Sequence, residues 1–375
     1  FSLIGEQIRG IVPRYRKLAE RGQIELSTTP YSHPLAPLLL DFASAREALP
    51  SIALPDDSYP GGRSRMEAHI LTALESHVRR FGARPAGMWP AEGAVSDRLL
   101  EMLAEHGVAW AASSEAVLAN SLKQAHPSRH LAERKDYLYR PYRVRTAKGE
   151  VGMLFRDDRL SDLIGFEYAK WFGKDAALHF VHSLEEIRHA APGDAPPLVP
   201  VILDGENAWE YYPYNAFYFL SDLYAELESH PAIRTVTCSE ALQAHPAEKL
   251  PGVAAGSWVY GTFSTWIGAP EKNAAWLALC EAKRTYDLVM GSARLEAAER
   301  AAAERQLAVC EGSDWFWWFG DYNPQHSVAS FDRLYRDNLT HLYRLLRLPA
   351  PVELAQPFSQ GGGQAESGGT MRRAS

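Results

Sequence analysis

The sequence predicts an α/β fold, a barrel of parallel strands, followed by a helical domain. Short apolar, β-branched runs alternate with amphipathic segments over the first two thirds of the 375 residues, which is the pattern of strands connected by helices in a parallel sheet. The run at 199–203 is the clearest strand, because it is apolar throughout and too short for a buried helix. From residue 265 onward the chain becomes Ala-rich with helical spacing.

The barrel half begins with an amphipathic helix that ends near Gly22. A strand at 24–26 leads into a Pro-rich loop that carries His33, and a short strand later in the chain precedes Glu92. Gly107 is the residue expected to end a helix at 97–105. The other elements expected here are a helix at 63–81, a strand at 108–112, two strand-like runs within 139–155, a helix at 214–227 and a strand at 233–236.

The chain is expected to divide into three parts. Residues 1–260 form the barrel and residues 261–350 the helical domain, while residues 351–375, rich in Gly, Ser and Gln at their end, are predicted to be a disordered tail. Since Phe1 already stands in a helical pattern, we expect the barrel to lack its first strand. The helical domain should contain helices at 271–289, 292–309 and 331–348, with an aromatic loop at 311–323 folded over a cleft.

Composition excludes several classes of protein. The formal charge of -7 and the absence of basic runs interleaved with aromatics argue against a nucleic-acid partner. No stretch reaches the ~18–20 apolar residues of a membrane span. Three widely spaced cysteines suggest a reducing compartment, so we expect a cytoplasmic protein. The 10 Trp, 17 Tyr and 14 Phe, several of them in turn-rich sequence, suit a carbohydrate site or an interface.

Two carboxylates follow apolar strands directly, Glu92 and Asp204. Parallel strands end at one rim of a sheet, so the two groups could face each other across a cleft. Cleavage of a glycosidic bond needs such a pair, one group acting at the anomeric carbon and the other donating a proton to the leaving oxygen. The simpler interpretation is that Asp204 caps the helix that follows it.

Other candidates lie in loops. His33 is a substrate contact or a solvated loop histidine. The charged segment at 156–162 is an exposed ion-pair cluster or part of a site, and its apolar flanks favour the site. Trp209, Tyr211 and Trp315 could wall the cavity and raise the pKa of the acid by desolvation.

Several ordered blocks resemble glycoside hydrolase family 57, which contains α-amylases, 4-α-glucanotransferases, branching enzymes and amylopullulanases. The resemblance covers most of residues 20–345. The blocks are Gly22-Gln-Ile-Glu25 with Tyr31-Ser-His-Pro34, Met88-Trp-Pro-Ala-Glu-Gly93, Leu203-Asp-Gly-Glu206 and Gly312-Ser-Asp-Trp-Phe-Trp-Trp318.

The resemblance implies a (β/α)7-type barrel, incomplete at the N-terminus, that acts on α-glucans with retention and needs neither a metal nor another cofactor. Glu92 matches the nucleophile and Asp204 the acid/base. The family's first block, a His-Gln-Pro-like motif, is absent, in line with the missing strand. The substrate-binding residues expected from the matching blocks and the charged loop are His33, Trp89, Arg156, Asp157, Glu206, Trp209, Asp314, Trp315 and Trp317.

Two other interpretations remain open at this stage. The chain could be a glycan-binding relative that has lost its chemistry, although both carboxylates are present. It could also resemble the metal-dependent polysaccharide deacetylases or α-mannosidases, which group Asp and His ligands at the barrel rim. The histidines here form no such group beside the two carboxylates.

Overall fold

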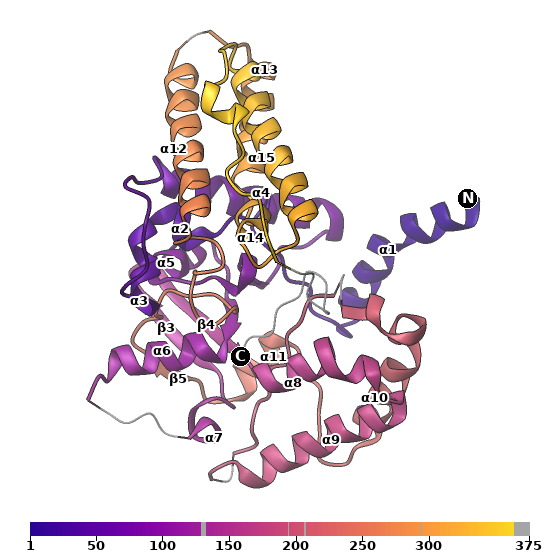
Figure 1. The fold of residues 1–375 in the computed structure, drawn as a ribbon. Helices are drawn as coiled ribbons and strands as arrows, with labels where there is room; N and C mark the ends of the chain where they lie inside the picture. The colour runs from indigo at the N-terminus through magenta and orange to yellow at the C-terminus, as the bar shows by residue number, and fades with distance from the viewer. Residues whose placement is uncertain (129–132, 194, 206–207, 293, 364–375) are drawn as a thin grey trace.

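The computed structural model describes residues 1–128, 133–193, 195–205, 208–292 and 294–363. A five-stranded sheet in the order β1-β2-β4-β3-β5 forms its centre, and helices pack around it (Figure 1). The strands are β1 Gly87–Met88, β2 Trp110–Ser114, β3 Tyr142–Thr146, β4 Gly149–Arg156 and β5 Glu248–Leu250. Strands β1, β2 and β4 are parallel, whereas β3 runs antiparallel to β4 and parallel to β5.

The helical content agrees with the amphipathic pattern of the sequence. The predicted helices at 63–81 and 97–105 are confirmed as α4 and α5, and Gly107 takes the expected positive φ. The longer helices are α1 Ser2–Glu20, α4 Gly62–Phe81, α5 Asp97–Glu105, α6 Glu115–Ala125, α9 Gly173–Ala190, α10 Phe217–Ser229, α12 Pro270–Met290, α13 Ala297–Cys310 and α15 Gln325–Leu345. The shorter ones are α2 Ala36–Leu40, α3 Ala45–Ala48, α7 Arg134–Tyr137, α8 Asp158–Asp162, α11 Cys238–Ala244 and α14 Asp314–Trp318. No helix in these described ranges is long and apolar enough to cross a membrane.

The expected strands at 24–26, 199–203 and 233–236 are extended but belong to no ladder. At 199–203 the reason is chemical, because Pro200 has no N–H to donate. Its carbonyl still accepts from the N–H of Asp157 at 2.8 Å. Side chains alternate as in a strand: Val199, Val201 and Leu203 pack on the main core, and Ile202 packs on the opposite side. The segment therefore runs beside the end of β4 and keeps the strand's two faces.

A small second cluster fills the other face of the sheet. It joins Trp110 and Ala112 of β2 to Leu154 of β4 and Leu242 of α11, with Leu198, Ile202 and Trp89 packed against it. Glu25 links the first extended segment to α11, because its carboxylate accepts from Trp110 Nε1 at 2.6 Å and from the N–H of Ser239 at 2.9 Å. Side chains from successive segments thus converge as they do inside a barrel.

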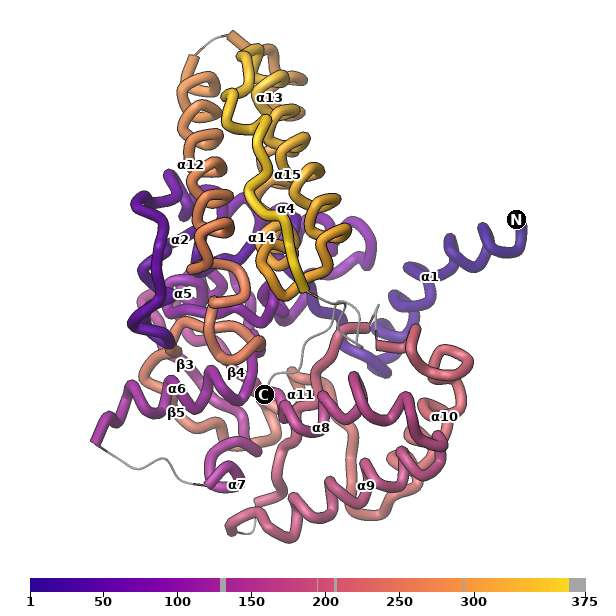
Figure 2. The backbone as a smooth tube through the Cα atoms, in the orientation of Figure 1, coloured from indigo at the N-terminus to yellow at the C-terminus, as the bar shows by residue number. Residues whose placement is uncertain are grey.

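The helical unit stands at one end of the sheet, with α12, α13 and α15 side by side (Figures 1 and 2). Its core is aromatic: Trp276 of α12 stacks on Phe316 of α14 at 3.9 Å, and Phe316 packs edge-on against Tyr335 of α15. The same core includes Leu38 and Ala94 from the barrel half, so the two parts share apolar contacts. Part of the predicted aromatic loop is the short helix α14 rather than a loop.

Residues 351–363 differ from the predicted disordered tail. They begin with the 3-10 turn Val352–Ala355 and bury Leu354. The Asp332 carboxylate then accepts from the N–H groups of Phe358 and Ser359 at 2.7 and 3.2 Å. This partly buried chain satisfies its polar groups with α15, a contact that composition could not reveal. The prediction for residues 364–375 lies outside the described residues.

Candidate active site

Glu92 stands on a strained turn directly after β1. The 3-10 turn Ala91–Gly93 places Glu92 at φ 59° and ψ 25°, in the left-handed region. Gly93 follows at φ 57°, and a Cβ there would lie 2.9 Å from Trp89 Cη2 and 3.1 Å from Trp258 Cβ, so only glycine fits. Backbone bonds from Trp258 N to Glu92 O at 3.0 Å and from Val95 N to Gly256 O at 2.9 Å hold the turn. Strain retained in this way is typical of functional positions.

The Glu92 carboxylate is enclosed by polar groups. Trp258 Nε1 donates to Oε2 at 2.9 Å, and His33 Nδ1 lies 4.0 Å from Oε1. Burial raises the pKa of Glu92 to about 8; the charges of Asp204 and Asp314 also raise it, while hydrogen bonds from Trp258 and Ser313 lower it. Three carboxyl groups therefore share one cavity, and Glu92 retains its proton near neutral pH.

The helical unit closes this site from the other side. Its residues 312 and 313 are joined to the His33 loop by a bridge between Pro34 and Gly312 and by a bond from Ser313 N to His33 O at 2.9 Å. Ser313 Oγ also bonds His33 Nδ1 at 2.8 Å. Ser32 and His33 both have positive φ, 60° and 57°, which turns the imidazole toward Ser313 and Glu92. Asp314 follows directly and begins α14.

These groups line one cavity of about 460 Å³. Its walls are aromatic and its polar groups are mainly carboxylates, an arrangement that suits a ligand with apolar faces and hydroxyl edges. Seven residues singled out from the sequence line it: His33, Trp89, Glu92, Arg156, Asp204, Asp314 and Trp317.

Three other predicted contacts do not line the cavity. Asp157 is fully buried and bonds Arg134 at 2.7 Å and Tyr139 Oη at 2.9 Å, so its carboxylate is used within the fold. Trp209 packs edge-on against Tyr212 and the main core. Trp315 donates Nε1 to Val309 O at 2.8 Å and stacks on Tyr335. Glu206 lies outside the described residues.

Sequence reasoning missed several lining residues. The most informative is Trp258, which stands in an aromatic run just before the helical unit. Its position near Glu92 depends on the pairing of residues 95 and 256, which no local pattern shows. The lining residues outside the predicted segments are Gly165, Phe166, Val259 and Phe331, whereas Ser161 and Asp162 belong to the charged segment 156–162 and Leu203 and Trp318 to the matching blocks.

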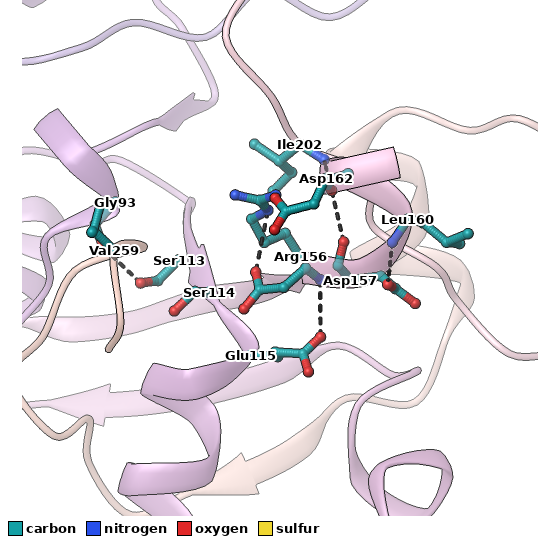
Figure 3. A network of polar contacts seen from close by, with 12 residues as sticks. Gly93, Ser113, Ser114, Glu115, Arg156, Asp157, Leu160, Asp162, Ile202 and Val259 are labelled. Carbon is teal, nitrogen blue, oxygen red and sulfur yellow. Dashed lines mark hydrogen bonds and ion pairs between the residues drawn. The ribbon is translucent and has the colours of Figure 1, made fainter. Parts of the chain in front are cut away.

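Arg156 connects the cavity to a buried ionic network at the end of β4 (Figure 3). Its Nη2 bonds Asp162 at 2.7 Å, its Nε lies 3.2 Å from Asp158 Oδ1, and its guanidinium stands 5.1 Å from the centre of the Trp258 ring. Trp258 therefore contacts the Arg156 guanidinium through the face of its ring and the Glu92 carboxylate through its N–H. Ser113, at the end of β2, donates to Gly93 O at 2.6 Å, which fixes the turn from below. Within the described ranges no group of three or more potential ligands is arranged to hold a metal ion.

Glu92, which follows β1, and Asp204, which follows the segment 199–203, line one cavity walled by tryptophans, and this arrangement is typical of a carbohydrate-active enzyme. Comparison of the sequence with known families identifies the family of this enzyme. The family model "Glycosyl hydrolase family 57" matches residues 2–255. The chain belongs to this family, as predicted, and no curated protein matches it.

Solved structures agree with this fold. A GH57 branching enzyme of Thermococcus kodakaraensis is 16% identical, with a TM-score of 0.68 over 91% of this chain and 69% of that one. An α-amylase of Thermotoga maritima is 16% identical, with a TM-score of 0.65 over 92% and 71%. A 4-α-glucanotransferase of Thermococcus litoralis is 16% identical, with a TM-score of 0.59 over 91% and 51%. These likenesses confirm the predicted fold class, an α/β barrel with a helical unit.

Proposed function

We propose that the protein is a retaining glycoside hydrolase or transglycosidase that acts on α-glucans. The observation that carries the proposal is that Glu92, fixed on its strained turn by Trp258, faces the same tryptophan-lined cavity as Asp204. Family membership and likeness to enzymes named for α-glucan chemistry support it. The three free cysteines, Cys238, Cys280 and Cys310, support a cytoplasmic location.

The geometry suggests a double displacement. Asp204 donates its proton to the glycosidic oxygen while a Glu92 oxygen attacks the anomeric carbon, so that the C–O bond breaks and a glycosyl ester forms. Asp204, now ionised, takes a proton from water or from a sugar hydroxyl, whose oxygen attacks the same carbon and releases Glu92. The Trp258 N–H stabilises the ionised form of Glu92, which attacks in the first step and is released in the second. Trp89 and Trp317 can pack on sugar faces.

The stereochemistry of the first product tests the proposal. With maltoheptaose, proton NMR of freshly formed product should show the α-anomer before mutarotation, because two inversions restore the configuration. A β-anomer as first product would contradict the double displacement. Binding of maltoheptaose without any turnover would instead indicate a glycan-binding protein.

The pH dependence of kcat/KM should reflect the raised pKa of Glu92. Glu92 must be ionised to attack, and its pKa is raised to about 8, so kcat/KM should fall as the pH drops below about 8 rather than below the ordinary value near 4.5. Because the Asp314 charge raises this pKa, Asp314→Asn should move the acid limb to lower pH. Asp321→Asn, an exposed neighbour, is the control. An acid limb that stays in place in Asp314→Asn would contradict this coupling.

A further inference from the structure

A second cavity, of about 530 Å³, lies behind the wall of the first. Its lining comes from α6, α7 and the segment 158–167, and none of the catalytic groups belongs to it. The apolar surface of this cavity comes from Ala116, Ala119, Tyr137 and Leu163. The polar groups are Glu115, Arg134, Asp158, Arg159, Asp162 and Glu167.

One short stretch of chain forms the wall between the two cavities. Asp162 lines both of them. In the π-helical turn Leu163–Glu167 that follows α8, Gly165 and Phe166 face the catalytic cavity, while Leu163 and Glu167 face the second one. A π turn inside a helical segment is frequent at functional sites. Since one wall separates the cavities, a ligand long enough to pass its edge can occupy both.

The second cavity offers hydrogen-bonding groups, and some of its charged groups are already paired with each other. Arg134 is already paired with Glu115 and Asp157, two residues that are labelled in Figure 3. Asp158 is only 6% exposed, yet its Oδ1 has no hydrogen-bond partner, although Arg156 Nε lies 3.2 Å away. Burial raises the pKa of Asp158 to about 8, with Arg156 opposing and Glu115 adding to the rise, so the carboxyl can donate as well as accept near neutral pH.

This chemistry selects a neutral polyhydroxyl ligand. Four carboxyl groups against two guanidinium groups disfavour a phosphorylated or carboxylated ligand. Within the described ranges no metal-binding group is present here either. Sugar hydroxyls match fixed carboxyl and guanidinium groups, and the apolar face of a sugar ring matches Tyr137 and Leu163.

We propose that the second cavity is a binding site for a further segment of an α-glucan, so that long chains are held on both sides of the 158–167 wall. This inference rests on the proposed function, because it takes the same class of substrate. It goes beyond that function in assigning Ala119, Tyr137 and Asp158 to substrate binding outside the catalytic cavity. The consequence is a preference for long glucans over short ones.

Chain-length kinetics test the inference. Ala119→Trp should fill the cavity from α6 and raise the ratio of KM for maltoheptaose to KM for maltotriose by about tenfold. Ala125→Trp, on the same helix but outside both cavities, is the matched control. Asp158→Leu keeps a side chain of similar volume but removes the oxygens that donate and accept hydrogen bonds, so it should change the ratio in the same direction even if Ala119→Trp fails to fold.

The outcomes separate the two proposals. If the wild-type enzyme cleaves maltoheptaose but both variants keep the KM ratio of Ala125→Trp, the second site is overturned and the proposed function stands. If the wild-type enzyme cleaves neither glucan, the proposed function fails and this inference with it. Calorimetric titration of maltoheptaose into Glu92→Gln provides a readout without turnover, in which adding Ala119→Trp should weaken binding by the same factor.

Discussion

Glu92→Gln is expected to lower kcat by about 10⁴-fold while leaving the fold intact. Glutamine keeps the shape of the side chain and its contact with Trp258 Nε1 through the amide oxygen, but it cannot form the glycosyl ester. Initial rates with maltoheptaose and a circular dichroism spectrum would measure the two parts of this prediction. Glu75→Gln, exposed on α4, is the matched control and should behave as the wild type.

Azide rescue distinguishes the role of Glu92 from that of Asp204. In Glu92→Gly, azide takes the place of the missing nucleophile and should give a β-glycosyl azide in a single displacement. In Asp204→Gly, azide attacks the glycosyl ester and should give an α-glycosyl azide. Exchange of these two products would mean that the roles are reversed, and activity close to wild type in Glu92→Gln would exclude it as the nucleophile.

Arg65→Leu is expected to destabilise the protein by about 3–5 kcal/mol, because it leaves a charge buried without its partner. Arg65 Nε and Nη2 bond the two oxygens of Glu311 at 2.8 and 2.9 Å, and His69 Nε2 bonds Oε2 at 2.7 Å. Tyr59 Oη completes the cluster. Burial alone would raise the pKa of Glu311, but the bonds from His69 and Arg65 lower it to about 2. Urea denaturation followed by fluorescence measures the loss.

The same cluster gives the sign of the pH dependence and a matched control. Since the pKa of Glu311 is lowered on folding, its contribution to stability is present above about pH 4.5 and is lost as the pH falls toward 2. Arg63→Leu, which breaks an exposed pair with Glu105, should cost at most about 1 kcal/mol. The double variant Arg65→Leu with Glu311→Leu should be more stable than Arg65→Leu alone. A loss in Arg65→Leu no larger than in Arg63→Leu would contradict the account of this cluster.

The two carboxylates, Glu92 and Asp204, are the part of the site that the sequence predicts most directly. Glu92 and Asp204 follow apolar segments, and the expectation that such segments end at one rim places both in the same cavity, although 199–203 is not a strand of the sheet. Trp258 could not be placed in this way, because it reaches Glu92 through pairing between residues 95 and 256. Asp157 was placed at the site for its charge, yet its neighbours Arg134 and Tyr139 bind it within the fold.

In the fold, too, features set by local sequence are predictable, and features set by contacts between distant residues are not. Helices α4 and α5 carry their own periodicity and end signals, so their bounds were accessible. At 199–203 the apolar pattern was correct for side-chain burial but Pro200 prevents a ladder, and at 311–323 the aromatic run forms the core of the helical unit as well as the cavity wall. Such outcomes depend on partners far along the chain, which a local pattern does not contain.

Covalent trapping tests the central claim most directly. The enzyme would be incubated with 5-fluoro-α-glucosyl fluoride, whose fluoride leaves as the ester forms and whose ring fluorine slows the second step. Digestion and mass spectrometry would then locate the added fluoroglucosyl group. The account predicts this group on the peptide that contains Glu92, at its carboxylate. A group on Asp204, or the absence of any adduct in an enzyme that cleaves maltoheptaose, would contradict it.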